Sequence, residues 1–355
     1  MILTPGGWVQ GSVRFTAAIQ SIEPGDAPPD RFILPGFVDL HVHGGGGADV
    51  MTGADGVRGM AAFHARHGTT ALLATTVTAP EADLRAAAAG VAEAMRRPAD
   101  RGARVVGWHL EGPFINPGAL GAQPAFAIPP DLTLAAEWCA LAPMRVATIA
   151  PEMDPDGGLL SFLTDQNVRV QIGHTLCSYA EARQALDRGA AGFTHLFNAM
   201  TGLHHRAPGA VGCALAVGTH AEIIADLFHV EQPALLIALR AIPGLYAVTD
   251  AVAAAGMPDG TYTLGRNRVE KMGEVVRLAD GGLAGSVLTM DRALRNLMGA
   301  GLTMAAASAR VSTVAAAYLG LTDRGVLVPG AAADMVVVDG AGHVMGVVAE
   351  GVVIG

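Results

Sequence analysis

Two patterns of apolar and polar positions, one typical of buried strands and one of helices, alternate along this chain and predict its fold. Short runs rich in Val, Ile, Leu, Ala and Thr, which suit buried strands, are separated by longer segments with helical periodicity. The predicted strands cover residues 36–43, 69–76, 104–111, 145–150, 169–173, 192–195, 222–226 and 245–250. Eight strands that alternate with helices predict an α/β fold of the (βα)8 TIM-like barrel type.

Helix-start signals lie between these strands. Pro80 before Glu81 suits a first helical turn, and Ser178 followed by Glu181 has the spacing of a capping box. Residues 112–130, rich in Pro and Gly, predict a long loop, and residues 267–282 predict a charged hairpin. Two further helices near residues 290–298 and 304–318 close the barrel region.

The two ends of the chain differ from its middle. Residues 1–35 and 326–355 contain short strand patterns separated by Gly and Pro turns, and neither has a helical period. We therefore expect these segments to form one small β-sandwich domain. The remaining residues, 36–325, would form the catalytic barrel.

Composition excludes several classes of protein. The chain has 355 residues, 51% of them hydrophobic, enough for a large buried core. Mean hydropathy is +0.39, but charged residues or His interrupt every apolar run before spanning length, and the N-terminus lacks a signal core. The net charge of −9 without basic clusters argues against nucleic acid. We expect a cytoplasmic protein with three reduced thiols and no membrane contact.

Residue types that bind metals recur at the carboxyl ends of the predicted strands. They are His41, His43, Glu111, His174, His195 and Asp250. His41 and His43 stand two positions apart and therefore project from the same face of a strand. In a (βα)8 barrel these strand ends meet at the face that carries the active site.

Nitrogen and oxygen ligands of this kind suit one or two divalent ions per subunit, with zinc expected first and iron or manganese as alternatives. Another interpretation is that one or two of the six residues only hydrogen-bond to ligands. His109, two positions before Glu111, is expected to support a ligand in that way.

Several stretches resemble a known family. Residues 34–44 (LPGFVDLHVHG) are similar to the amidohydrolase superfamily. Residues 109–114 (HLEGPF), 194–200 (THLFNAM), 248–251 (VTDA) and 283–286 (LAGS) narrow the resemblance to the N-acetylglucosamine-6-phosphate deacetylases. The match runs in order from about residue 34 to residue 300, and the combination of motifs is specific.

The resemblance implies a role for each matched residue. Glu111, His174 and His195 match a principal metal site, His41 and His43 match a second one, and Asp250 matches the catalytic carboxylate. Positions that match substrate contacts are Ala122, Gln123, Asn198, Ala199, Arg206, Asp226, Leu227, Phe228, His229, Leu283, Ala284 and Gly285. The family implies a homodimer with Arg206 and His229 near the interface. Without the resemblance, these two would be interpreted as solvated loop residues.

One position departs from the family, which usually has a histidine where this chain has Gln123. A glutamine can donate a hydrogen bond but cannot become cationic, which affects the predicted substrate more than the reaction. We expect metal-dependent hydrolysis of N-acetylglucosamine 6-phosphate to glucosamine 6-phosphate and acetate, in amino-sugar catabolism.

Three alternatives stay open. One is a related N-acyl amino sugar such as N-acetylgalactosamine 6-phosphate. Another is a cyclic amide, although related cyclic-amide hydrolases use a carboxylated lysine and the single lysine here, Lys271, lies in the charged hairpin. The third is a non-catalytic sugar-phosphate sensor on the same fold.

Overall fold

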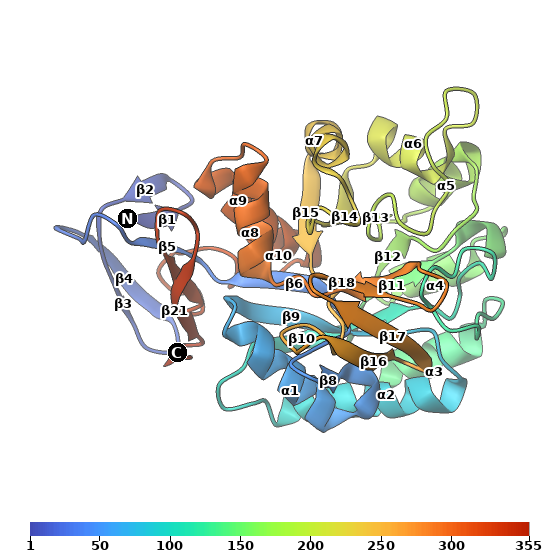
Figure 1. The fold of residues 1–355 in the computed structure, drawn as a ribbon, viewed down its shortest axis with the longest axis horizontal. Helices are drawn as coiled ribbons and strands as arrows, with labels where there is room; N and C mark the ends of the chain where they lie inside the picture. The colour runs from blue at the N-terminus through green and yellow to red at the C-terminus, as the bar shows by residue number, and fades with distance from the viewer. Residues whose placement is uncertain (355) are drawn as a thin grey trace.

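The structure, a computed structural model, describes residues 1–354 and is built around a parallel sheet of eight strands (Figure 1). In chain order the strands are β6 (Phe37–Val42), β9 (Thr69–Thr76), β10 (Arg104–Glu111), β11 (Met144–Ile149), β12 (Arg169–Ile172), β13 (Gly192–Phe193), β14 (His220–Ile224) and β15 (Gly244–Val248). Each pairs in parallel with the next. The predicted barrel strands and their order are confirmed.

The first and last barrel strands meet at their carboxyl ends. Asp250 donates its backbone N–H to the His41 carbonyl over 2.9 Å, and His43 donates to the Ala251 carbonyl over 2.9 Å. Below these bonds, the buried Asp39 carboxylate accepts a hydrogen bond of 2.6 Å from the Thr249 hydroxyl. The closure of the barrel therefore brings the His41–His43 segment against Asp250.

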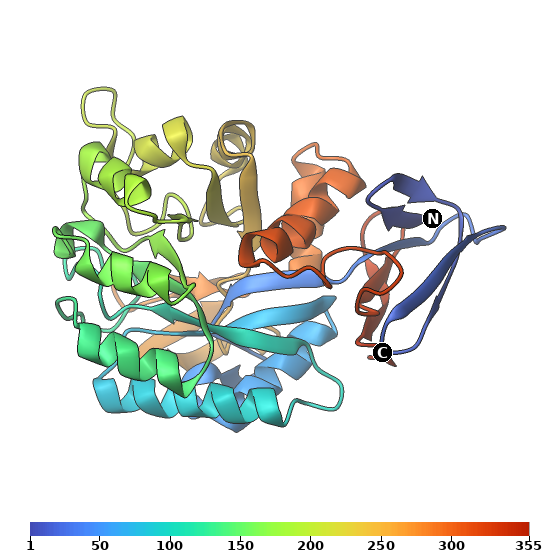
Figure 2. The same cartoon turned by 180° about the vertical axis from the view of Figure 1, so that it is seen from behind.

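Helices cover the outside of this sheet (Figure 2). They are α1 (Ala54–Ala65), α2 (Glu81–Arg96), α3 (Leu132–Leu141), α4 (Gly158–Asp165), α5 (Tyr179–Asp187), α6 (Gly209–Val217), α7 (Gln232–Ala241), α8 (Met290–Gly299), α9 (Met304–Val311) and α10 (Thr313–Leu319). The predicted capping box is present, since Ser178 and Glu181 each accept from the other's backbone N–H. Every residue of β6 and β9 is buried, as expected for parallel strands that are covered on both faces.

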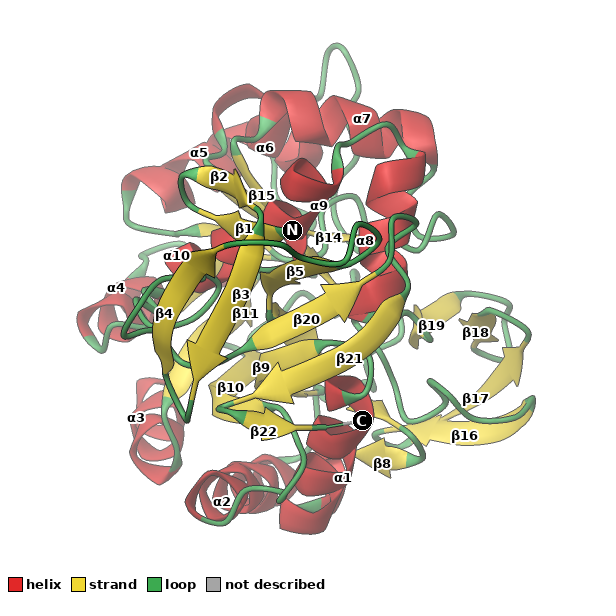
Figure 3. Cartoon of the chain, turned by 90° about the vertical axis from the view of Figure 1, so that its left-hand side faces the viewer, coloured by secondary structure: helices red, strands yellow, loops and turns green. Residues whose placement is uncertain are grey.

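The ends of the chain share a six-stranded sheet beside the barrel (Figure 3). It contains β1 (Ile2–Thr4), β2 (Gly7–Val9), β5 (Phe32–Pro35), β20 (Met335–Val338), β21 (Val344–Ala349) and β22 (Val352–Val353). β20 pairs antiparallel with β5, which joins the two termini, and β3 (Gly11–Phe15) and β4 (Ile19–Pro24) form a separate hairpin. The division into residues 1–35 plus 326–355 and residues 36–325 stays a prediction.

The predicted charged hairpin is part of a larger insertion. Strands β16 (Gly260–Leu264), β17 (Asn267–Met272), β18 (Val275–Arg277) and β19 (Leu283–Ser286) form a four-stranded antiparallel sheet. Leu283–Gly285, whose positions match substrate contacts of the family, thus lie on a strand that pairs with β18. This insertion sheet reaches the long loop 112–130, where Asn267 donates a hydrogen bond of 3.0 Å to the Ala122 carbonyl.

The remaining elements are short. They are β7 (Gly44–Gly45), β8 (Ala48–Asp49) and the 3-10 turns η1 (Val50–Thr52) and η2 (Pro151–Met153). Within residues 1–354, none of the helices combines the length and apolar character of a membrane-crossing segment.

Candidate metal centre

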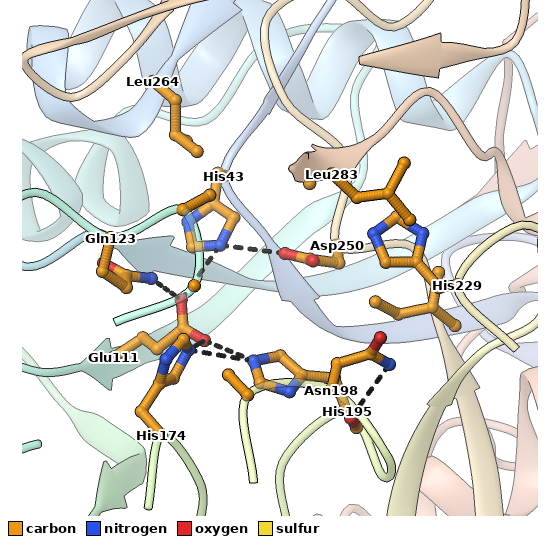
Figure 4. Close-up of a pocket in the computed structure, with 15 residues that line it drawn as sticks. His43, Glu111, Gln123, His174, His195, Asn198, His229, Asp250, Leu264 and Leu283 are labelled. Atoms are coloured by element: carbon orange, nitrogen blue, oxygen red, sulfur yellow. Dashed lines mark hydrogen bonds and ion pairs between the residues drawn. The ribbon is translucent and has the colours of Figure 1, made fainter. Parts of the chain in front are cut away.

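Three predicted ligands from different strands meet at the carboxyl face of the barrel. Glu111 Oε1 lies 3.0 Å from His174 Nε2 and 2.9 Å from His195 Nε2. The two Nε2 atoms lie 3.1 Å from each other (Figure 4). All three side chains are almost fully buried. We refer to Glu111, His174 and His195 as the principal ligand group.

A second group lies directly beside the first. His41 Nε2 and His43 Nε2 are 3.2 Å apart, and Asp250 Oδ1 lies 3.4 Å and 3.0 Å from them, respectively. The other oxygen of Glu111, Oε2, is 3.2 Å from His43 Nε2. His41, His43 and Asp250 form the second ligand group, and Glu111 of the principal ligand group connects the two, because its Oε1 contacts one group and its Oε2 the other.

The donor atoms in each group fit a divalent ion. Imidazole nitrogens and carboxylate oxygens that ligate one ion at about 2.0–2.2 Å lie roughly 3.0–3.5 Å apart from one another. The separations in both groups, 2.9–3.4 Å, lie within 0.1 Å of this range. Facing Nε2 atoms repel unless a proton or a cation lies between them, so an ion shared by the lone pairs is the simplest way to stabilise both groups.

The backbone is strained where these side chains project. Positive φ angles are uncommon for residues with a side chain, and His174, His195 and Asp250 have φ values of 47°, 25° and 50°. Phe197, Ala199 and Leu227 on the same face also have positive φ. Such strain concentrates at functional sites, where the surrounding fold must hold it in place.

The electrostatics keep the carboxylates ionised. Burial raises the pKa of Glu111, but the charge of His41 and the hydrogen bonds from His174 and His195 lower it well below its usual range. For Asp250, burial is likewise outweighed by His43 and His41, and its pKa falls to about 2. At neutral pH both side chains are therefore anions that can bind a cation or accept a proton.

His109 does not face the pocket. Its Nδ1 lies 3.2 Å from the Leu40 carbonyl and its Nε2 lies 2.7 Å from the Thr148 hydroxyl. Both ring nitrogens are thus used within the barrel, and neither contacts one of the six predicted ligands.

A pocket opens over the two ligand groups, and the structure brings only part of the predicted substrate set to it. Ala122, Gln123, Asn198, Ala199, His229, Leu283 and Gly285 line it. Asp226 lies behind the wall, where it accepts from the His229 ring and backbone. Leu227, Phe228 and Ala284 are not in the lining, and Arg206 is exposed beside His205.

Gln123 contacts the ligands directly. Its Oε1 accepts from the Thr78 backbone N–H over 2.6 Å, and its Nε2 donates to Glu111 Oε2 over 2.5 Å (Figure 4). We call these two hydrogen bonds the Gln123 clamp, and they hold the side-chain amide against the Glu111 carboxylate. The second Nε2 hydrogen makes no hydrogen bond within residues 1–354.

Sequence reasoning missed some residues of this site. Gly121, Ile224 and Leu264 also line the pocket, and the Glu222 carboxylate contacts His41 from within the barrel. A glutamate inside a buried apolar strand is a signal for an inward-facing carboxylate, and Glu222, the third residue of β14, could have been found in this way.

Comparison with known proteins agrees with this geometry. The profile of the amidohydrolase family matches residues 32–354. This chain belongs to the amidohydrolase family. It is 40% identical to an N-acetylgalactosamine-6-phosphate deacetylase from Escherichia coli O157:H7, covering 99% of this chain and 96% of that one.

Other similar proteins are named as deacetylases of the epimeric sugar, N-acetylglucosamine 6-phosphate. An N-acetylglucosamine-6-phosphate deacetylase from Lysinibacillus sphaericus is 37% identical over 87% of this amidohydrolase and 82% of its own length. The structure of the Thermotoga maritima N-acetylglucosamine-6-phosphate deacetylase superposes with a TM-score of 0.93 at 30% identity, covering 100% and 98% of the two chains. A Mycobacterium smegmatis variant in complex with N-acetyl-D-glucosamine-6-phosphate superposes with a TM-score of 0.88 at 32% identity, covering 95% and 92%.

Proposed function

We propose that this amidohydrolase removes the acetyl group of N-acetylglucosamine 6-phosphate by metal-dependent hydrolysis, releasing glucosamine 6-phosphate and acetate. The observation that carries the proposal is the Asp250 carboxylate, which projects into a pocket formed over two adjoining ligand groups. Similarity over 87% or more of this chain to deacetylases of N-acetyl amino-sugar phosphates supports the substrate class.

The pocket residues divide the chemistry between them. Glu111, His174 and His195, with His41, His43 and Asp250 beside them, would hold a divalent ion, whose Lewis acidity would polarise the amide carbonyl and lower the pKa of water. Asp250 is ionised and takes the proton of the attacking water as general base. It then returns the proton to the amide nitrogen, because an amine anion is too poor a leaving group to depart unprotonated.

His229 is suited to the phosphate end of the substrate. Burial lowers its pKa, but the hydrogen bond from its Nδ1 to Asp226, 2.7 Å long, and the charge of Asp226 outweigh burial and raise the pKa above 6.5. The ring is thus favoured as a cation while its other edge faces the pocket. Arg206 lies outside the pocket of a single chain, so its predicted contact needs a second copy, and a homodimer remains part of the proposal.

The cyclic-amide alternative is disfavoured by the position of the single lysine. Lys271 lies on β17 of the insertion sheet and pairs with Asp259 over 2.8 Å. It is absent from the pocket lining, and Glu111 occupies the place between the two ligand groups. A hydrolase that depends on a carboxylated lysine therefore does not fit this site.

One experiment tests both the proposed substrate and its epimer. The epimer is included because the Escherichia coli O157:H7 relative is named as a deacetylase of N-acetylgalactosamine 6-phosphate. Purified protein would be assayed for acetate release from both N-acetylhexosamine 6-phosphates and from both unphosphorylated sugars. We expect the highest kcat/KM for N-acetylglucosamine 6-phosphate and a large drop without phosphate. Preference for the galactosamine epimer would reassign the substrate, and no acetate release from any of the four sugars would refute the deacetylase proposal.

A further inference from the structure

A buried carboxylate outside both ligand groups contacts each of them. Glu222 on β14 has no exposed surface, and its Oε2 lies 2.9 Å from His41 Nδ1. The same oxygen accepts the backbone N–H of His195 over 3.3 Å. One oxygen of Glu222 thus touches a histidine from the second ligand group and a histidine from the principal one.

No arginine or lysine within residues 1–354 pairs with Glu222, and its only ion-pair partner is His41. A buried carboxylate without a cation is costly, so this charge must be offset by the groups that it contacts. Its other oxygen has only a long contact, 3.4 Å, with the Tyr246 hydroxyl. The charge of Glu222 is therefore directed mainly at the His41 ring.

His41, His109 and Glu222 lie close enough together to be considered a metal site of their own. The hydrogen bonds of His109 disfavour a separate metal site, because both of its ring nitrogens already contact other groups, the Leu40 carbonyl and the Thr148 hydroxyl. His41 Nδ1 is the ring atom that faces Glu222, while its Nε2 faces His43 and Asp250. The two edges of this ring thus face different partners.

We propose that Glu222 is a positioning residue that holds His41 in the Nδ1-protonated tautomer and thereby aims the Nε2 lone pair at an ion in the second ligand group. A carboxylate can only accept at this contact, so His41 must donate its Nδ1 proton, and Nε2 is left as a free donor for metal. The negative charge also increases the basicity of the ring. Contacts of this kind are typically worth about 10- to 100-fold in metal affinity.

The proposal deepens the function proposed above and rests on it only for the use of a metal. It also predicts a selective effect. Glu222 touches the ring of His41 but only the backbone of His195, so its removal should weaken the second ligand group and leave the principal one nearly unchanged.

The test measures metal binding to the purified full-length protein. Metal-free wild type, Glu222→Gln and Glu222→Leu would be titrated with Zn²⁺ in the presence of a competing chelator, with bound ions per chain measured after equilibrium dialysis. For wild type we expect two ions. For Glu222→Leu we expect one of them to bind roughly 10- to 100-fold more weakly and the other within about threefold of wild type. Glu222→Gln, which keeps an acceptor oxygen but not the charge, should fall between them.

Tyr246→Phe is the matched control, because it removes a group that contacts the other oxygen of Glu222 and leaves the His41 contact intact. It should bind both ions as wild type does. Thermal unfolding of the metal-free proteins shows whether each variant is folded, and the isosteric Glu222→Gln keeps the test decisive if Glu222→Leu does not fold.

Equal weakening of both ions, wild-type affinity in Glu222→Gln and Glu222→Leu, or a single ion in wild type would overturn the role of Glu222. Acetate release by wild type is measured separately on N-acetylglucosamine 6-phosphate. Absence of acetate release would refute the proposed function, but it would not change what the metal titrations show about the role of Glu222.

Discussion

Asp250 combines three features that a proton-transfer group needs: burial, ionisation and a position in the pocket lining, where its carboxylate contacts His41 and His43. Its strained backbone, with φ of 50°, turns the carboxylate into the pocket at the end of β15. Gln123 and His229 approach the same pocket from separate loops. Each of these three residues therefore has a specific and separable effect on turnover.

Replacing Asp250 by Asn should abolish most turnover while the principal ion stays bound. The amide keeps the size of the side chain but cannot accept the water proton, and a general acid–base group is typically worth about 10²- to 10⁴-fold in rate. Steady-state kinetics and metal analysis of Asp250→Asn check this. Turnover within about tenfold of wild type would rule out the assigned role.

Gln123→Ala should lower kcat/KM about two- to tenfold, the usual worth of one neutral hydrogen bond, and should retain the principal ion. Gln123→Glu should be worse than Gln123→Ala, because it places a second carboxylate beside Glu111. Gln123→His should be tolerated and should add an ionisation near pH 6–7 to the rate profile. Wild-type kinetics for Gln123→Ala would show that the clamp does not assist catalysis.

His229→Gln should raise KM for phosphorylated substrate and leave unphosphorylated substrate almost unaffected. Because burial lowers the pKa of His229 but the contact with Asp226 outweighs burial and raises it, the cationic ring is favoured, and it loses its charge as pH rises through the raised pKa. The wild-type KM for phosphorylated substrate should therefore increase at alkaline pH, and His229→Gln should remove that component. Arg206→Ala should show the same substrate selectivity if a second copy brings it to the pocket. An equal effect on both substrates would exclude phosphate as the ligand of these residues.

Among the elements, the insertion sheet has the clearest link to the site. β16 and β19 contribute Leu264, Leu283 and Gly285 to the pocket, and Asn267 on β17 holds the Ala122 carbonyl in the loop that carries Gln123. The sheet thus forms one wall of the pocket and anchors the loop above it.

Asn267→Ala should free this loop and raise KM roughly two- to tenfold with little change in bound metal, since one hydrogen bond is lost. Arg268→Ala is the matched control, because Arg268 lies next along β17 and is exposed, with contacts only to Thr261 and Glu270 of the same sheet. A KM in Asn267→Ala equal to that of Arg268→Ala would show that the anchor is dispensable.

In the whole molecule, the β5–β20 ladder joins the two ends of the chain, and a buried ion pair lies within the C-terminal part, between residues 324 and 350. Arg324 Nη1 lies 2.5 Å from Asp334 Oδ2, and Arg324 also pairs with Glu350 near the C-terminus. Glu350 in turn donates its backbone N–H to Asp334 over 2.7 Å. Arg324 and Asp334 are both buried, so each depends on the other for charge compensation.

Arg324→Leu should cost about 3–5 kcal/mol of unfolding free energy at pH 7, because it leaves the Asp334 carboxylate buried without a cation. Burial already raises the pKa of Asp334, and loss of Arg324 raises it further. A carboxyl group whose pKa is higher in the folded protein than in the unfolded chain makes the protein less stable as pH rises. The loss of unfolding free energy in Arg324→Leu should therefore be smaller at pH 5 than at pH 7. Urea unfolding at both pH values measures this. A loss below about 1 kcal/mol at pH 7 would place the pair among weak surface bridges.

Much of this molecule follows from local sequence pattern. Apolar runs of strand length, separated by helix-start signals such as Ser178 and Glu181, were enough to predict eight parallel strands, because strand and helix periods are local properties. Metal-binding residue types at strand ends predicted the ligand face, because a closed parallel barrel brings its carboxyl strand ends together.

Tertiary structure decided how those residues face one another. Glu111 lies between two ligand groups, Gln123 turns toward Glu111, and Glu222 lies behind His41, although none of these contacts has a sequence signal in its spacing. The strand at Leu283–Gly285 likewise depends on pairing with β18. Such contacts join residues as far apart as 181 positions, and only the closed barrel with its insertion sheet determines the distances between them.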